Sequence, residues 1–301
     1  MNYYCTLFDS NYLTRGLSLY QSLVNVHEDF WLFVYALDNT ARDILRELDL
    51  PRMTIITLKD FERDDLLTAK NNRTWQEYCW TCTSYTTLFT LENFNIPEVT
   101  YVDSDLFFFD KPSIVLDELK NAGKDVLITH HNYSPQYEQT EIHGAYCVQF
   151  MTFKNNDNGL HILKWWRDRC LEWCYARLED GKFGDQKYLD DWPERFRGVH
   201  VMQNKAAGLA PWNIQQYDCQ PGPTVNGMKG IFYHFHNLKW CRNAADEWVE
   251  PAPSFYYLSD NVLRYIYQPY LNSLKTSLEI VRQAYDKDFI KGIVWPDYKF
   301  W

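Results

Sequence analysis

The stretch VTYVDSDLFFFD, residues 99–110, predicts both the fold class and the place of a functional site. The apolar run before Asp103 is typical of a buried strand. If the chain turns after that strand, the carboxylates of Asp103 and Asp105 can approach one cation, whereas on a continuing strand they would point to opposite faces. Oxygen ligands favour Mg²⁺ or Mn²⁺. We therefore expect a divalent cation at this strand end, where it would hold a nucleotide diphosphate.

Strand-like and helix-like stretches alternate through the first half of the chain. Five apolar runs are typical of strands: 3–8, 30–37, 53–58, 99–102 and 125–129. Between them, apolar residues recur at helical spacing after polar residues that can cap a helix, such as Thr40. This order predicts an α/β fold with a mostly parallel sheet flanked by helices. Ligands of such a sheet collect beyond the carboxyl ends of its strands, where Asp103 should lie.

The last part of the chain has a different pattern. From about Ser259, apolar residues recur at the spacing of an amphipathic helix. We expect a catalytic domain over residues 1–258 and a C-terminal helical extension over residues 259–301. The extension also carries Trp295, Phe300 and Trp301, which favour contact with a membrane surface or a partner enzyme. Packing of the extension against the catalytic domain is the alternative.

Composition excludes some classes of partner. The net charge of −10 disfavours a duplex nucleic-acid partner, which needs a basic face. The N-terminal residues lack the pattern of a signal peptide, and no apolar run approaches the ~20 residues that span a bilayer. A cytoplasmic protein, with peripheral contact at the inner membrane face as an alternative, is expected. The 12 Trp, 22 Tyr and 18 Phe are consistent either with a large aromatic core or with a pocket that stacks on sugars or bases.

Two cysteine pairs have spacings that zinc sites use. Cys79 and Cys82 form a C-x-x-C, and Cys170 and Cys174 are four residues apart. Both pairs lie in aromatic, helix-like stretches without the tight turn of a zinc knuckle. We interpret them as buried free thiols of a cytosolic protein.

The segment FYHFHNLKW, residues 232–240, offers a third metal ligand. His234 and His236 alternate on an extended stretch, and Lys239 follows. An imidazole would complete a Mn²⁺ site, and Lys239 could neutralise a leaving phosphate. A purely structural histidine is the alternative, and a separate role for His236 is not indicated by the sequence.

Four segments together resemble the GT-A glycosyltransferases of glycosyltransferase family 8, which include glycogenin and bacterial lipopolysaccharide galactosyl- and glucosyltransferases. The segments are CTLFDSNYLTRGLSLYQSL (5–23), YVDSDLFFF (101–109), FGDQKYLDDW (183–192) and HFHNLKW (234–240). They occur in the order of that family, and the similarity covers roughly residues 1 to 240. The chain looks closest to a bacterial branch of the group. The resemblance implies the GT-A fold, a Rossmann-like arrangement that binds nucleotide sugars.

The resemblance also implies the substrates and the residues that bind the nucleotide. The donor would be a nucleotide sugar, usually UDP-linked, and transfer would retain the anomeric configuration. The acceptor would be a glycan or a lipid-linked glycan in bacterial surface polysaccharide synthesis. Asp9 and Tyr12 would hold the uracil, with Tyr12 stacking on it. Ser104 would contact the ribose or a phosphate, and Lys239 would contact the diphosphate.

The metal and the sugar have their own implied residues. Asp103, Asp105 and His234 would bind Mn²⁺. Asp185 and Gln186 would lie at the donor sugar, where a retaining transferase needs polar groups beside the anomeric carbon. A double-displacement route would make one of these two a covalent nucleophile, and a front-face route needs none. The alternative for this segment is a helix cap.

The chain departs from the family pattern at three places. The spacing from His234 to Lys239 is one residue shorter, and the proline before the final tryptophan is absent. Cys147 and Gln149 stand where the family usually has Asn and Gly, which indicates an altered sugar pocket. The stretch 79–89, before the D-x-D strand, contains no Lys or Arg, although family members often carry one there.

Two other functions remain open at this point. The unusual Cys147 and Gln149 are compatible with a non-catalytic nucleotide-sugar or carbohydrate-binding protein with a degenerate transferase site. A haloacid-dehalogenase-like phosphatase also uses D-x-D after a strand, with Asp103 then acting as nucleophile. That family prefers the motif on its first strand, and it prefers Thr or Val where this chain has Phe107.

Overall fold

The structure is a computed structural model, and it describes residues 1–238, 241–242, 248–249, 256–285 and 293–294. The predictions for Lys239, Trp295, Phe300 and Trp301 therefore concern residues outside the described part. Within it, no helix is long and apolar enough to cross a membrane.

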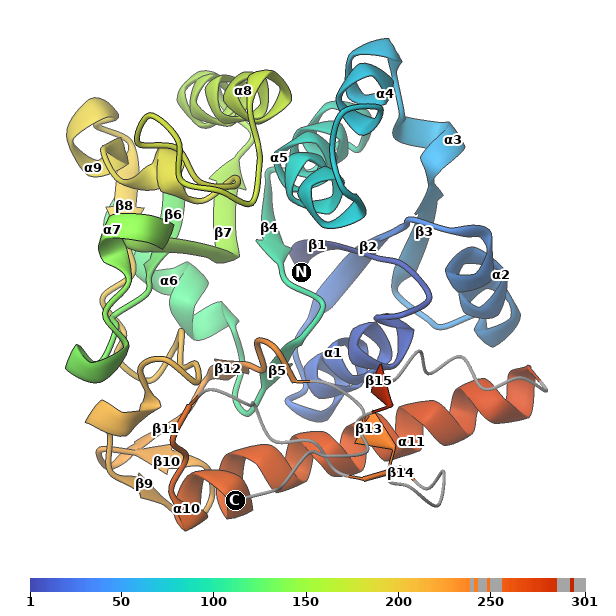
Figure 1. The fold of residues 1–301 in the computed structure, drawn as a ribbon, viewed down its shortest axis with the longest axis vertical. Helices are drawn as coiled ribbons and strands as arrows, with labels where there is room; N and C mark the ends of the chain where they lie inside the picture. Colours follow the sequence, from blue (N-terminus) through green and yellow to red (C-terminus); the bar gives the residue numbers. More distant parts are fainter. Residues whose placement is uncertain (239–240, 243–247, 250–255, 286–292, 295–301) are drawn as a thin grey trace.

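A seven-stranded sheet forms the centre of the molecule (Figure 1). Its strands are β1 (Asn2–Phe8), β2 (Phe30–Ala36), β3 (Met53–Thr57), β4 (Glu98–Val102), β6 (Val126–His130), β7 (Tyr146–Lys154) and β8 (Val199–Val201). Their order is β3-β2-β1-β4-β7-β6-β8. Only β7 runs antiparallel to its neighbours in this sheet. The five predicted strands and the mostly parallel sheet are confirmed.

Helices cover both faces of the sheet (Figure 1). On one face lie α1 (Leu13–Asn25), α2 (Asn39–Leu48), α6 (Ser113–Asn121) and α11 (Gln268–Ala284). On the other lie α4 (Asp64–Lys70), α5 (Trp75–Asn93), α8 (Asp157–Glu172) and α9 (Trp192–Arg195). Each set buries its own hydrophobic core against the sheet. The remaining short helices are α3 (Leu58–Phe61), α7 (Thr140–His143) and α10 (Asp260–Val262).

Local side-chain contacts set the beginnings of the helices. Helix α5 begins with a capping box, in which the side chains of Thr74 and Glu77 bond reciprocally to the backbone. Helix α2 was expected to begin after Thr40, but this prediction is wrong. Asp38 is the N-cap, since its carboxylate accepts from the Ala41 N–H at 2.7 Å. The same carboxylate accepts from the backbone and hydroxyl of Ser10, which links β1 to α2.

The chain turns sharply after β4. The backbone N–H of Leu106 donates to the carbonyl of Asp103 at 3.1 Å, and β5 (Leu106–Phe108) follows at once. Strand β5 pairs antiparallel with β12 (Phe232–His234), so that Leu106 faces His234 in the register. This pairing carries His234 to the end of β4.

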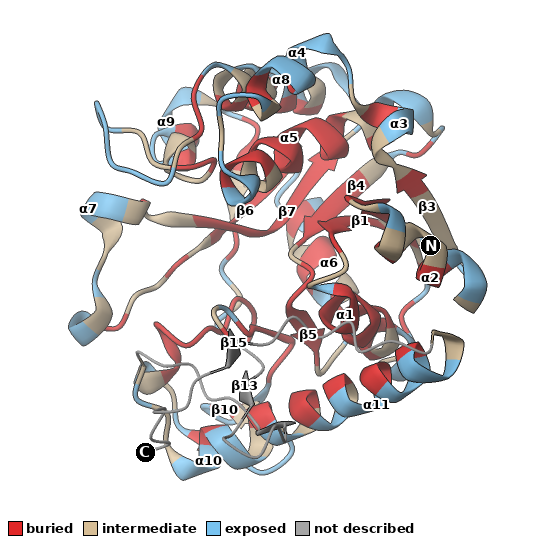
Figure 2. Ribbon diagram, turned by 45° about the vertical axis from the view of Figure 1, so that its right-hand side comes forward, coloured by how far each residue is buried: buried red, intermediate tan, exposed pale blue. Residues whose placement is uncertain are grey.

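Residues 260–284 form an amphipathic helical stretch, as expected. A one-turn π-helix (Leu263–Tyr267) connects α10 to α11, and α11 packs on α1. Buried and exposed residues alternate along α11 in Figure 2. Ser18 of α1 and Ser277 of α11 share a buried hydrogen bond of 3.0 Å. Helix α11 therefore packs against the catalytic domain, which was the alternative to contact with a membrane or a partner enzyme. The domain boundary at residue 258 stays a prediction.

Smaller strands complete the described part. They are β9 (Cys219–Gln220), β10 (Thr224–Val225), β11 (Met228–Lys229), β13 (Cys241–Arg242), β14 (Trp248–Val249) and β15 (Ile293–Val294). The cysteines whose side chains are described carry free thiols, which agrees with the interpretation of Cys79, Cys82, Cys170 and Cys174 as unpaired.

Candidate functional site

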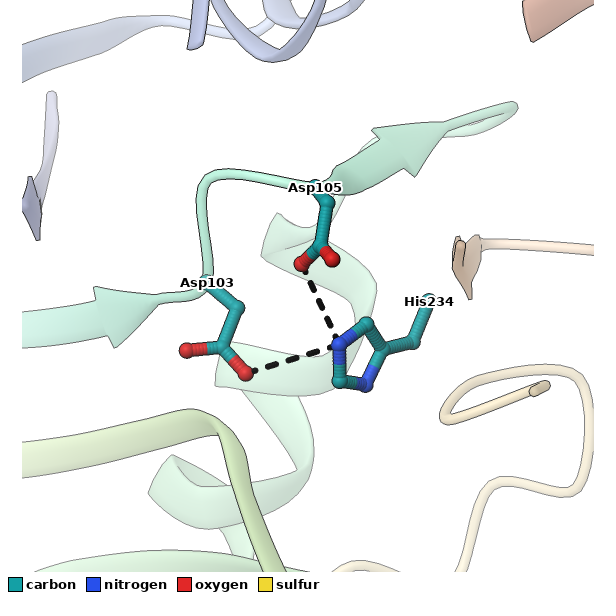
Figure 3. Close-up of side chains that lie close together, drawn as sticks. All are labelled: Asp103, Asp105 and His234. Carbon is teal, nitrogen blue, oxygen red and sulfur yellow. Dashed lines mark ion pairs between the residues drawn. The ribbon is translucent and has the colours of Figure 1, made fainter. Parts of the chain in front are cut away.

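Asp103, Asp105 and His234 converge at the carboxyl end of β4 (Figure 3). The Nε2 of His234 lies 3.1 Å from Oδ1 of Asp105 and 3.6 Å from Oδ2 of Asp103. Each residue offers one ligand atom, and these atoms all lie within 4.8 Å of one another. The sequence-based prediction that a turn lets both carboxylates face one point is confirmed by this geometry.

Backbone hydrogen bonds hold the three residues in place. The N–H of Asp103 donates to the carbonyl of Gln149 on β7 at 2.9 Å. The N–H of Phe235 donates to the carbonyl of Asp105 at 3.0 Å, and the N–H of His234 donates to the carbonyl of Leu209 at 2.8 Å. The ligand positions therefore depend on the sheet and on the β5–β12 pair.

The three ionisable groups strongly perturb one another. Burial opposes ionisation of Asp105, but the ion pair with His234 outweighs it and lowers the pKa of Asp105 to about 2. Burial also opposes the charge on His234, yet its carboxylate neighbours, Asp105 foremost, raise the pKa of His234 well above its usual value. The pKa of Asp103 is raised by its burial, with repulsion from Asp105 adding to this.

This donor set fits a hard or borderline divalent cation. Two carboxylate oxygens and one imidazole nitrogen suit Mn²⁺, and the oxygens suit Mg²⁺. The side chain of Asp103 is 28% exposed, so the group can be reached from solvent, while Asp105 and His234 are buried. The Tyr101 hydroxyl donates to the other oxygen of Asp103 at 2.8 Å, which orients that carboxylate.

Asp185 is buried near Asp103, as expected for a residue of the same site. Burial and, next in size, the charge of Asp103 together raise the pKa of Asp185 to about 8, while a hydrogen bond with Thr83 acts in the opposite direction. Its backbone carbonyl accepts from the Trp166 indole at 2.8 Å. Gln186 follows at the start of a 3₁₀ turn, Lys187–Leu189, and is half-buried.

The residues expected to bind the base lie at the start of α1. Tyr12 immediately precedes α1 and is 42% exposed. Burial raises the pKa of Tyr12, and the charges of Asp105, Asp9 and Asp103 act in the same direction. Asp9 accepts from the backbone and side chain of Asn11, and from the Trp75 indole at 3.0 Å. Any base contact of Asp9 would therefore have to share or replace these bonds.

Fewer contacts are described for the remaining residues of the predicted site. Ser104 is buried in the turn between Asp103 and Asp105. Lys239 lies outside the described residues. His236 makes ring contacts with Trp212 and His234, at centroid distances of 5.4 and 5.6 Å.

Several contacts at the site were not predicted from the sequence, and Trp75 and Arg15 were not identified as residues of the site. Both amide atoms of Gln149 are buried without a hydrogen-bond partner among the described residues, and so is Nδ1 of His234. The Cys147 thiol interacts with His234. Trp75 contacts Asp9, and Arg15 lies under Tyr12 with its guanidinium carbon 4.5 Å from the ring centroid. None of these contacts follows from a local sequence pattern.

Comparison with solved structures shows the GT-A fold. A galactosyltransferase, LgtC, in complex with donor and acceptor sugar analogues matches with a TM-score of 0.56 and 13% identity, over 91% of this chain and 95% of that one. The glycosyltransferase GlyE of Streptococcus pneumoniae TIGR4 matches with a TM-score of 0.53 and 12% identity, over 94% and 62%. At such low identity the likeness concerns the fold alone. It confirms the predicted α/β fold class and gives no support to the haloacid-dehalogenase-like alternative.

Sequence comparison identifies nearer relatives. No protein-family model matches the chain. The uncharacterized protein YfnD of Bacillus subtilis (strain 168) is 28% identical over 312 residues, which cover 97% of this chain and 94% of YfnD. The uncharacterized protein YfnF of the same organism is 32% identical over 248 residues, which cover 78% of this chain and 81% of YfnF. The chain therefore belongs to the family of the Bacillus subtilis protein YfnF.

Proposed function

We propose that the protein is a metal-dependent glycosyltransferase that moves a sugar from a UDP-linked donor to a glycan or lipid-linked glycan acceptor, with retention of configuration. The observation that carries the proposal is the Asp103–Asp105–His234 cluster at the carboxyl end of β4 in a GT-A fold. The resemblance to glycosyltransferase family 8 supports the UDP donor, retention and a role in bacterial surface polysaccharide synthesis on the cytoplasmic side.

Asp103, Asp105 and His234 would hold the cation. A bound Mn²⁺ or Mg²⁺ supplies Lewis-acid stabilisation of the departing diphosphate. The protein positions its ligands before the cation arrives, because β4, β7 and β12 fix their backbones. Preorganised charge of this kind costs little rearrangement during the reaction.

Asp185 and Gln186 would act at the donor sugar. The Asp185 carboxyl is buried next to Asp103, whose charge disfavours ionisation of Asp185. A bound cation would offset the charge of Asp103, and the ionised Asp185 would then stabilise positive charge that develops at the anomeric carbon. The Gln186 amide can orient a sugar hydroxyl. Tyr12 offers an exposed aromatic face for the base, and exposed aromatic faces bind planar bases by stacking.

Calorimetry with UDP and Mn²⁺ tests the proposal. The unaltered protein should bind UDP only when the cation is present, and Asp105→Asn should lose this binding because one ligand charge is gone. Asp117→Asn, which alters an exposed carboxylate on α6, is the matched control and should bind normally. Absence of UDP binding to the unaltered protein, or equal binding to Asp105→Asn, would contradict the proposal.

A non-catalytic nucleotide-sugar-binding protein is the second candidate. The observation that favours it is the buried Gln149 amide, which has no hydrogen-bond partner among the described residues, together with the interaction between Cys147 and His234. A screen of UDP-sugars for slow hydrolysis in the presence of Mn²⁺ separates the two. Hydrolysis of at least one donor supports the transferase, whereas tight binding without hydrolysis or transfer supports the binding protein.

A further inference from the structure

Arg15 is a buried guanidinium at the start of α1, and only 6% of the residue is exposed. Its Nη2 donates to the carbonyl of Leu238 at 2.5 Å, and its Nη1 donates to the carbonyl of Asn11 at 3.3 Å. The guanidinium lies against the ring of Tyr12. Arg15 therefore connects Tyr12, the residue expected to stack on the base, to the chain segment that follows His234.

The charge of Arg15 has no partner of its own among the described residues. Its contacts are two carbonyls and a ring, and no carboxylate of the described part forms an ion pair with it. A buried charge without a counter-charge is costly, so such residues are usually paired with an anion. The charge of Asp105 acts on Arg15 without forming an ion pair, and the candidate cation would neutralise that carboxylate.

A count of charges at the proposed site indicates that the diphosphate of the donor could be the anion that balances Arg15. Asp103 and Asp105 contribute two negative charges, which a divalent cation offsets. A nucleotide sugar brings about two further negative charges on its diphosphate, and the leaving nucleoside diphosphate carries about one more. The stretch 79–89 on α5 supplies no Lys or Arg to offset them. A positive charge at Arg15 would add to the charge expected from Lys239 and would act from the side of α1.

We propose that Arg15 is a positioning residue for a nucleoside diphosphate at this site. It covers the inner face of the Tyr12 ring, which leaves the outer face for the base, and it anchors the carbonyl of Leu238. Its charge compensates that of the diphosphate through space, because the guanidinium is buried and is not itself exposed to the ligand. This inference rests on the proposed function.

Affinities for uridine, UMP and UDP, measured by calorimetry with Mn²⁺, test the role of the charge. In Arg15→Gln, UDP affinity should fall about tenfold more than uridine affinity, with UMP between them, because the lost interaction grows with ligand charge. In Arg15→Lys, the ratio of UDP to uridine affinity should stay near that of the unaltered protein. Arg46→Gln removes an exposed arginine on α2 and should change none of the three affinities.

The outcomes separate the possible roles. Equal losses for uridine and UDP in Arg15→Gln would show that Arg15 only supports Tyr12, and would overturn the charge role. If Arg15→Gln does not fold, a changed UDP-to-uridine ratio in Arg15→Lys would overturn it as well. Absence of UDP binding to the unaltered protein would overturn the proposed function and this inference together. This result differs from the two above, in which the unaltered protein binds UDP and only the role of Arg15 is overturned.

Discussion

The Nε2 nitrogen of His234 lies 3.1 Å from Asp105 and 3.6 Å from Asp103, so it faces both carboxylates at once. Despite the opposing effect of burial, these carboxylates raise the pKa of His234 well above its usual value. In the metal-free protein a proton on this nitrogen therefore provides the positive charge that a cation would provide. A cation bound at this site would compete with the proton for the same atom.

This competition predicts that Mn²⁺ binding releases about one proton at neutral pH and that Mn²⁺ affinity falls as the pH falls. Calorimetry in two buffers with different ionisation enthalpies measures the proton release as a difference in heat. His234→Gln should bind Mn²⁺ weakly and without that difference. His161→Gln, which alters an exposed histidine on α8, should behave like the unaltered protein. Identical heats in both buffers for the unaltered protein would contradict the prediction.

Asp185 predicts a pH dependence of stability in the metal-free protein. Burial, with the charge of Asp103 adding to it, raises the pKa of Asp185 to about 8 from about 4 in the unfolded chain. Between these values the folded protein binds more protons than the unfolded chain. The free energy of unfolding contributed by this group is therefore fully present below about pH 4 and is lost as the pH rises through about 8.

Urea unfolding in EDTA at pH 5, 7 and 9 measures this effect. Asp185→Asn should lose less stability than the unaltered protein between pH 5 and pH 9, because an amide does not ionise. Asp117→Asn, on the exposed side of α6, should retain the full loss. The same pH dependence in Asp185→Asn and in the unaltered protein would show that the carboxyl is not held neutral.

The local signals of the sequence predicted the sheet and the D-x-D strand end correctly. An apolar run that stops at Asp103 leaves few alternatives to a buried strand with a polar end. The start of α2 was less well determined, since Asp38 and Thr40 are both good caps. Asp38 prevails in the structure, where its carboxylate also accepts from Ser10, 28 residues away in the sequence.

Contacts between segments that are far apart in the sequence could not be predicted from local sequence patterns. The resemblance implied that His234 joins Asp105 at the metal. This approach depends on the pairing of β12 with β5, which was not predicted. The hydrogen bond from Arg15 to Leu238 spans 223 residues. The Trp75 contact with Asp9 likewise needs α5 to begin beside β1. Such contacts depend on the packing of complete elements.

Gln149 predicts that a substitution close to the site can stabilise the protein. Its side chain is fully buried, and neither amide atom has a hydrogen-bond partner in the part of the chain that the structure describes. An unsatisfied buried polar group costs about 1–3 kcal/mol. Gln149→Met, which is similar in shape, should therefore raise the free energy of unfolding by about 1 kcal/mol. Gln136→Met, at an exposed position, is the control. A decrease of similar size would indicate that an ordered water satisfies the amide.

Leu274 tests whether the C-terminal helix is part of the same cooperative unit as the sheet. It is fully buried where α11 packs on α1. Leu274→Ala should lower the free energy of unfolding by about 2–5 kcal/mol, because it removes packed atoms and leaves a cavity. Glu279→Ala, on the exposed side of α11, should change it by less than about 0.5 kcal/mol. Urea unfolding followed by circular dichroism and by tryptophan fluorescence measures both. A single unfolding transition that shifts in both probes would mean that α11 unfolds together with the sheet. This result is expected because the apolar face of α11 belongs to the same hydrophobic core as α1. A separate early transition in Leu274→Ala, with the main one unmoved, would instead make residues 259–301 an independent extension.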